Sequence, residues 1–168
     1  MSTKTKERPG FSWEEICHDP RFQDLPYKIE TNARGQIVMS PTYQYHGALQ
    51  YKIGRLLDDR LSAGTVVTES AVATSDGKKV ADVAWFSEAR WEQVKDALDA
   101  PIAPEIAVEV HSPGNTDEEL AHKRRLYFEA GAEEVWTCAE DGHITVYGEE
   151  GQRDASRRVP SFPDEVDV

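Results

Sequence analysis

Two acidic residues stand inside segments that otherwise read as buried strands, and a carboxylate in such a place suits a metal ligand. Asp82 lies in the middle of KVADVAWF, and Glu109 lies in EIAVEV. Because successive side chains of a strand point to opposite faces, both segments present apolar residues on each face. An ionised carboxylate there is costly unless it is paired or coordinates a metal ion. Each acid could instead lie near a strand end and face solvent, but two acids in consecutive β segments favour a shared site.

A lysine lies on the expected inner face of the helix that follows the Glu109 segment. We expect residues 117–130 to be helical, and the apolar stripe of this helix consists of Leu120, Tyr127 and Ala130. Lys123 lies on this stripe, because the steps from Leu120 to Lys123, Tyr127 and Ala130 are 3, 4 and 3 residues. The connection from Glu109 is short, so the helix packs back over the same sheet and Lys123 can reach the carboxylates. The alternative is a lysine whose stem covers apolar surface and whose ammonium lies in water.

Two acids and a lysine are the groups that metal-assisted phosphodiester hydrolysis requires. Carboxylate oxygens are hard ligands that suit Mg²⁺ or Mn²⁺. The metal lowers the pKa of a bound water and neutralises charge on the scissile phosphate. The lysine orients the attacking water or stabilises the developing negative charge. The sequence therefore predicts a metal-dependent hydrolytic centre at Asp82, Glu109 and Lys123.

The elements that must position these residues follow in an order typical of a mixed β-sheet flanked by helices. YKIE and QIVM, separated by the turn residues 32–35, predict a β-hairpin. The apolar spacing over residues 45–61 predicts an amphipathic helix, with Gly64 as its C-terminal cap. The segments that then read as strands are TVVTES, KVADVAWF, EIAVEV, EVWTC and ITVYG. We therefore expect an α/β or α+β fold.

The two ends of the chain and one middle segment complete the expected organisation. Residues 1–10 are polar and end in Pro-Gly, which predicts a disordered N-terminal segment. Residues 11–168 have the size of a single domain. Residues 87–98 are expected to form a short surface helix or a loop, and SFPDEVDV near the C-terminus is a candidate for an edge strand.

Composition and charge limit the classes of function. The chain has 31 acidic and 19 basic side chains, a net charge of −12. This argues against strong non-specific DNA binding by the bare protein, although bound divalent cations add local positive charge. No stretch has the length of an apolar membrane helix, and the first residues lack the apolar core of a signal peptide. We therefore expect a protein that does not bind membranes. The two cysteines are far apart in the sequence, which argues against a disulfide framework and suits a cytoplasmic protein.

Several segments together resemble a known family. VADVAWFS, APEIAVEVHSP, HKRRLYFEAGAEEVWTC and ITVYG are similar to the Uma-type restriction endonuclease family, and so are KIETNARGQIVMSP and VPSFPDEV toward the two ends. The resemblance covers nearly the whole chain. The core of that family is similar to the PD-(D/E)XK nucleases, so the resemblance implies a restriction-endonuclease-like fold with an N-terminal β-hairpin.

The resemblance also implies roles for individual residues. By position, Asp82 is the metal aspartate, Glu109 is the second acid, and the Val110 carbonyl is a further ligand. The family commonly carries its lysine on the following helix, where Lys123 stands, and the position two residues after the glutamate is His111. His111 is a supporting candidate, and the resemblance implies two more, Glu30 and His46.

This sequence departs from the family pattern at two points. Ala81 precedes the aspartate where the family usually has proline, and Ala81 is not expected to be a ligand. The loop SPGNTDEEL is more acidic than usual, with Glu119 where aspartate is common, which weakens the approach of DNA.

Arg124, Arg125 and His111 each allow a functional and a structural interpretation. Arg124 and Arg125 follow Lys123 and are candidates for weak phosphate contacts, although a solvated helix face is the favoured interpretation. His111 beside Ser112 would suit a nucleophile and its base, but the sequence lacks a G-x-S-x-G elbow.

The function that we expect is a Mg²⁺- or Mn²⁺-dependent endonuclease acting on DNA. The alternative is a non-catalytic binding or assembly protein that retains the nuclease fold, and the charge of −12 and the acidic residues 117–119 favour it. RNA is a further possible substrate. A homodimer, which could build a shared groove, is implied by the resemblance.

Overall fold

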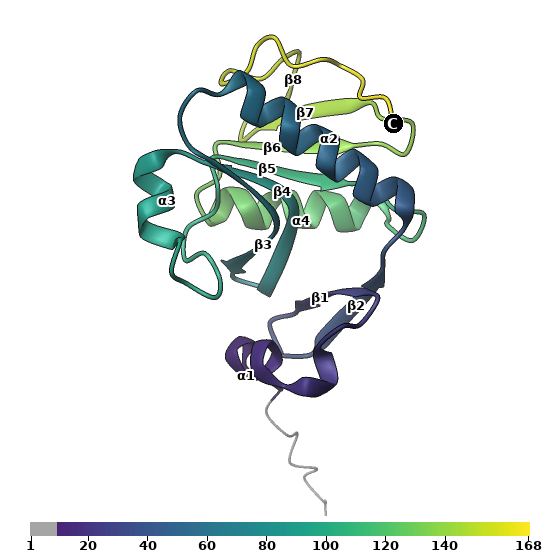
Figure 1. The fold of residues 1–168 in the computed structure, drawn as a ribbon, viewed down its shortest axis with the longest axis vertical. Coiled ribbons are helices and arrows are strands. Elements are labelled where there is room, and N and C mark those ends of the chain that lie inside the picture. The colour runs from purple at the N-terminus through teal and green to yellow at the C-terminus, as the bar shows by residue number, and fades with distance from the viewer. Residues whose placement is uncertain (1–9) are drawn as a thin grey trace, which may run out of the picture.

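The centre of the molecule is a six-stranded mixed sheet, seen in a computed structural model that describes residues 10–168 (Figure 1). In sheet order its strands are β3 (Thr65–Thr74), β4 (Gly77–Phe86), β5 (Ile106–Val110), β6 (Glu134–Cys138), β7 (Ile144–Gly148) and β8 (Gly151–Arg153). Neighbouring strands are antiparallel except β5 and β6, which are parallel. The predicted mixed sheet with flanking helices is confirmed. The disordered segment expected at residues 1–10 lies outside the described residues apart from Gly10.

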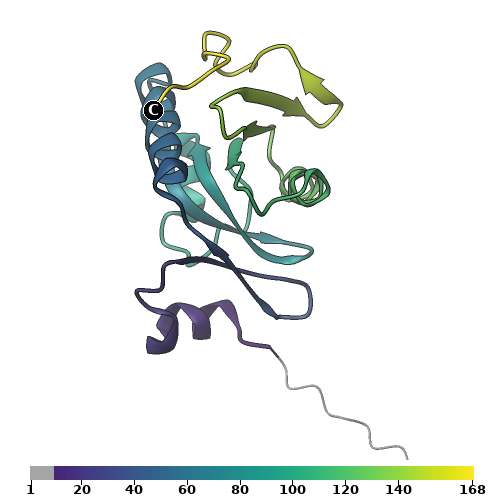
Figure 2. The ribbon, with the colours of Figure 1, turned by 90° about the vertical axis from the view of Figure 1, so that its right-hand side faces the viewer.

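Two long helices cover opposite faces of this sheet (Figures 1 and 2). Helix α2 (Gln44–Arg60) buries Leu49, Ile53 and Leu57 in the larger core cluster, together with Val83 and Val108 of the sheet. Helix α4 (Asp117–Glu129) connects the parallel strands β5 and β6 and buries Tyr127 on the other face. Thr116 and Glu119 form a capping box that fixes where α4 begins. A third helix, α3 (Glu88–Val94), packs beside β4.

Gly64 does not cap helix α2, so this prediction is wrong. The helix ends at Arg60, and Leu61 follows in extended conformation. Gly64 has a φ of 118°, and a Cβ there would lie 2.5 Å from the carbonyl oxygen of Phe86. The glycine is thus needed for the close approach of the chain to the end of β4.

The predicted hairpin is present, but it forms a sheet of its own. Strands β1 (Tyr27–Thr31) and β2 (Ile37–Pro41) pair only with each other, after the short helix α1 (Trp13–His18) and the 3₁₀ helix η1 (Pro20–Phe22). Figure 2 shows the hairpin below the large sheet, beside the β3–β4 hairpin. The Thr31 hydroxyl accepts a hydrogen bond from the Lys78 amide at 2.9 Å. Thr31 O also accepts one from Lys79 Nζ at 2.9 Å.

The edge strand expected at SFPDEVDV is absent, and this prediction is wrong. The last strand is β8, which lies earlier in the polar tail, and Glu165 makes only an isolated bridge to His143. Pro163 inside the segment and Pro160 just before it lack the N–H group that a continuous ladder needs. The segment nevertheless contributes Val166 to the core cluster and packs Phe162 against it, next to Val159.

A buried carboxylate joins the C-terminal segment to the sheet. Glu134 at the start of β6 is 1% exposed. Its carboxylate accepts hydrogen bonds from four donors: Trp136 Nε1 at 2.9 Å, Ser156 Oγ at 2.7 Å, the Arg157 amide at 2.7 Å and Arg153 Nη1 at 3.3 Å. A carboxylate with this many donors is fully satisfied, which is the condition for burying one.

Within residues 10–168, none of the helices combines the length and the apolar content that a membrane span requires.

Candidate active site

The register of β4 and β5 brings the two predicted acids together. Val83 pairs with Val108, so Asp82 and Glu109 each lie one residue beyond this pair, on the face that α4 covers. Regular pairing stops there, and the Val110 amide donates a hydrogen bond to Asp82 Oδ2 at 2.7 Å. Asp82 is 0% and Glu109 4% exposed. This burial excludes the alternative that the two acids face solvent.

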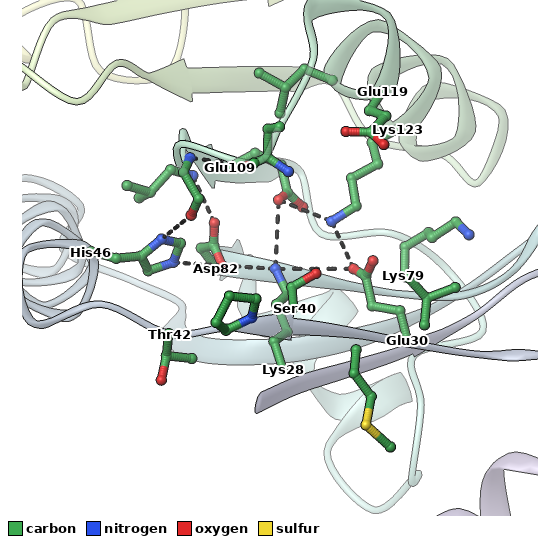
Figure 3. A pocket seen from close by; sticks show the side chains of 18 of the residues that line it. Lys28, Glu30, Ser40, Thr42, His46, Lys79, Asp82, Glu109, Glu119 and Lys123 are labelled. Carbon is green, nitrogen blue, oxygen red and sulfur yellow. Dashed lines mark hydrogen bonds and ion pairs between the residues drawn. The ribbon is translucent and has the colours of Figure 1, made fainter. Parts of the chain in front are cut away.

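Lys123 reaches the same point from helix α4 (Figure 3). Its Nζ lies 3.1 Å from Glu109 Oε2 and 2.7 Å from Glu30 Oε1. The side chain is 17% exposed, so the lysine is paired in the site, and the alternative of an ammonium in water is excluded. Tyr127, one helical turn further on, donates a hydrogen bond to Glu109 Oε1 at 2.7 Å. The three residues predicted to form the centre therefore meet, as does Glu30, which the resemblance implied.

Lys28 on strand β1 stands in the middle of this cluster, and the sequence reasoning missed it. Its Nζ lies 2.7 Å from Asp82 Oδ1, 3.6 Å from Glu109 Oε2 and 4.0 Å from Glu30 Oε1. Figure 3 shows its ammonium between these three carboxylates. Lys28 is two residues before Glu30 and lies on the same face of the strand, but the sequence alone does not show that this face meets Asp82.

His46 and Glu69 complete the cluster on the other side of Asp82. His46, in the first turn of α2, has Nε2 at 3.1 Å from Asp82 Oδ1 and Nδ1 at 3.0 Å from Ser112 Oγ. Gln50, one turn later, donates both to Glu69 Oε1 and to the Asp82 carbonyl oxygen, each at 2.6 Å. Glu69 has a φ of 54° and stands between the paired residues of β3 and β4. Nothing in its local sequence marks Glu69 as part of a site.

A pocket of about 420 Å³ opens onto this cluster. Its walls are formed by the hairpin residues Val38 and Met39, by Tyr43 before α2, and by Asn115 and His122 on the opposite side. The charged side chains of the cluster line it, so a ligand entering the pocket meets them directly: Lys28, Glu30, Glu69, Asp82, Glu109 and Lys123.

Three of the predicted site residues lie apart from this pocket. His111 does not line it, and His111 Nε2 is buried without a hydrogen-bond partner among the described residues. The guanidinium of Arg124 lies over the ring of Tyr147, 3.9 Å from its centroid. Arg125 Nη2 lies 3.4 Å from His122 Nδ1. The supporting role of His111 and the phosphate contacts of the two arginines remain predictions.

Burial and mutual attraction shift the pKa values of these groups in different directions. Burial alone would lower the pKa of Lys28, but the Glu109, Asp82 and Glu30 carboxylates outweigh it and raise this pKa. Burial would raise the pKa of Asp82, but Lys28 and His46 lower it far below its usual range. Burial raises the pKa of Glu109, and the attraction of the two lysines does not offset it. Asp82 is thus the firmly ionised carboxylate, and Glu109 takes up a proton more readily.

The donor set fits a hard divalent cation. His46, Glu69 and Asp82 each offer a ligand atom, and these atoms lie within 4.8 Å of one another. On the other side of Asp82, the ammonium of Lys28 shows that a cation can contact Asp82 Oδ1 and Glu109 Oε2 at once. Carboxylate oxygens with one imidazole suit Mg²⁺ and Mn²⁺. Asp82 belongs to both sets, so a cation held by either set would contact it.

The interaction of His46 with Asp82 makes stability depend on pH. The hydrogen bond to Asp82 raises the pKa of His46 above its ordinary value of 6.5. A histidine with a raised folded-state pKa contributes stability that is fully present below pH 6.5 and is lost as the pH rises through the folded-state pKa. In EDTA, His46→Gln is expected to cost about 1 kcal/mol more in the free energy of unfolding at pH 6 than at pH 9.

Urea denaturation at several pH values measures this difference. His143→Gln is the matched control, because His143 is exposed at the start of β7, away from the pocket. A cost of His46→Gln that is the same at pH 6 and pH 9 would contradict the charged His46–Asp82 pair.

Comparison with known proteins agrees with the fold and with the family resemblance of the sequence. The model of the Uma2 family, described as "Putative restriction endonuclease", matches residues 17–168. No curated protein matches the chain. A crystal structure of a "putative nuclease belonging to DUF820" from Anabaena variabilis is similar in fold, with a TM-score of 0.64 and 19% identity over 74% of each chain. At 19% identity the likeness to the Anabaena structure concerns the fold alone. The family match concerns nearly the whole sequence.

Proposed function

The chain belongs to the Uma2 family of restriction-endonuclease-like proteins, and from this premise we propose that it hydrolyses phosphodiester bonds of DNA with the help of Mg²⁺ or Mn²⁺. The observation that supports this most is the meeting of Asp82, Glu109 and Lys123 at the base of one pocket. Two acids from adjacent strands and an amine from the following helix are the groups that such a reaction requires.

Each residue has a role that follows from its surroundings. Asp82 and Glu109 would hold the cation, with the Val110 carbonyl as a further ligand. The Val110 amide fixes the direction of the Asp82 carboxylate, and Tyr127 fixes that of Glu109. The bound cation would activate water and neutralise phosphate charge. Lys123, which reaches the pocket from α4, would donate a hydrogen bond to the phosphate and stabilise its developing charge.

The charge of the cluster explains how an acidic protein could act on a polyanion. Glu30, Asp82 and Glu109 carry three negative charges when ionised, and Lys28 and Lys123 carry two positive ones. This leaves one negative charge, and Glu69, which completes the cluster, adds a second, so a divalent cation changes the sum from two negative charges to zero. The approach of a phosphate would then depend on the bound cation and would not need a basic protein surface.

The test is a cleavage assay with Mn²⁺ or Mg²⁺ on supercoiled plasmid, single-stranded DNA and RNA, each with and without EDTA. We expect cleavage of DNA that EDTA abolishes. Lys123→Met should lower the cleavage rate by about 10²-fold, because it removes a donor to the developing charge. Lys52→Met, on the exposed side of α2, is the control and should leave the rate unchanged. Equal rates for the wild type and Lys123→Met would exclude the proposed role of the lysine.

A second candidate is a binding or assembly protein that retains the nuclease fold. The observations that favour it are the net charge of −12 and the acidic first turn of α4, Asp117, Glu118 and Glu119. Calorimetric titration with Mn²⁺ separates the two candidate functions, because a binding-only protein needs no cation at Asp82.

Sedimentation of the same sample tests the homodimer that the family resemblance implies. The cytoplasmic location remains a prediction from the sequence.

A further inference from the structure

We propose that Lys28 is an internal counter-ion that occupies the cation position, so that a divalent cation can bind only by displacing its ammonium. This inference rests on the proposed function, since it concerns the same carboxylates. It goes further because it gives the site a built-in competitor, contributed by the hairpin.

The Lys28 ammonium lies where a cation shared by the Asp82 and Glu109 carboxylates would lie. It lies 2.7 Å from Asp82 Oδ1 and 3.6 Å from Glu109 Oε2, and its side chain is 10% exposed. Lys123 differs, because its ammonium contacts Glu30 and Glu109 and makes no ion pair with Asp82. Of the two lysines, Lys28 is therefore the one between the two acids expected to hold the metal (Figure 3).

A divalent cation and this ammonium cannot occupy the same place. Mg²⁺ binds oxygens at about 2.0–2.1 Å, so an ion shared by Asp82 and Glu109 would overlap the present position of Lys28 Nζ or lie in contact with it. Two positive charges at such a separation repel strongly in a buried site. The ammonium must therefore leave Asp82 when the cation binds.

The surroundings of Lys28 allow this movement. The side chain lines the pocket, so the ammonium has space on the open side. Glu30, on the same strand, is a second partner at 4.0 Å. A lysine has a flexible four-carbon stem and can change its rotamer without a change in the backbone. The exchange therefore requires only that one side chain turns within the pocket.

The experiment measures Mn²⁺ affinity by calorimetry and the melting temperature in EDTA, on the full chain. Lys28→Met should bind Mn²⁺ about ten-fold more tightly or better, because the competing charge is gone. In EDTA it should melt at a lower temperature than the wild type, because the carboxylates lose a counter-ion. Mn²⁺ should therefore raise its melting temperature by more than it raises that of the wild type. Lys28→Gln is the second variant, in case Lys28→Met does not fold.

Lys123→Met is the matched control, with the same loss of charge in the same pocket. Its affinity for Mn²⁺ should change less than that of Lys28→Met. If wild type and both Lys28 variants bind Mn²⁺ equally while Asp82→Asn does not bind it, the counter-ion role is wrong and the proposed metal site stands. If neither the wild type nor the Lys28 variants bind Mn²⁺, the metal site itself is wrong. Binding by the variants alone would support the competition directly.

Discussion

Asp82→Asn is expected to remove detectable Mn²⁺ binding and to lower DNA cleavage by about 10³-fold or more. Asp82 belongs to both possible ligand sets, with Glu109 on one side and with His46 and Glu69 on the other. Its pKa lies far below the usual range, so the wild-type carboxylate is ionised at every pH at which the protein would be assayed. The neutral amide keeps the shape of the side chain but cannot replace an anionic ligand.

The choice of asparagine separates this effect from unfolding. One amide oxygen can still accept the hydrogen bond from the Val110 amide, which is 2.7 Å from the wild-type carboxylate. Asp82→Ala would instead leave Lys28 buried without its nearest partner, at a cost of about 3–5 kcal/mol. Calorimetry, cleavage and the melting temperature should be measured for Asp82→Asn beside Asp59→Asn, which changes an exposed aspartate of α2. Wild-type Mn²⁺ binding by Asp82→Asn would refute the assignment of the metal site.

Glu134→Ala is expected to lower the free energy of unfolding by about 3–5 kcal/mol, a large effect away from the pocket. The substitution leaves four donors without their acceptor: Trp136 Nε1, Ser156 Oγ, the Arg157 amide and Arg153 Nη1. Glu134 is 1% exposed, so water cannot readily replace the carboxylate. Urea denaturation measures this loss.

The control for Glu134→Ala is Glu150→Ala. Glu150 also pairs with Arg153 and Arg157, but it lies on the surface and should contribute little. Mn²⁺ affinity should be unchanged in both variants, because the Glu134 network lies away from the pocket that contains Asp82. Equal stability of Glu134→Ala and the wild type would show that the network does not hold the C-terminal segment to the sheet.

The convergence of Asp82, Glu109 and Lys123 could be predicted because each position follows from a local period. Two acids inside otherwise apolar strands predicted a shared buried site, and the helical stripe through Leu120 and Tyr127 placed the lysine toward it. The register of β4 and β5 then brings both acids to one face. Local patterns are informative here because both strands and the inner face of the helix are packed in the core. The mixed sheet could be predicted for the same reason.

Lys28 and Glu69 could not be found in this way, since their roles depend on contacts between distant elements. The polar face of YKIE is typical of a solvated hairpin, and only its docking beside β4 turns Lys28 toward Asp82. Glu69 enters the site because the chain adopts a positive φ between two paired residues of β3. The C-terminal segment was mispredicted for a related reason, because Pro160 and Pro163 interrupt pairing although the apolar residues are buried.

The separation of the hairpin from the main sheet means that the candidate site is assembled from two separate sheets. Lys28 and Glu30 belong to the two-stranded sheet, whereas Asp82 and Glu109 belong to the six-stranded sheet. Gly77, at the β3–β4 turn, approaches the hairpin so closely that a Cβ there would lie 2.5 Å from the Thr31 carbonyl oxygen. A side chain at this remote turn would push the hairpin outward as a unit and shift the electrostatic potential at Asp82 without altering any group that lines the pocket.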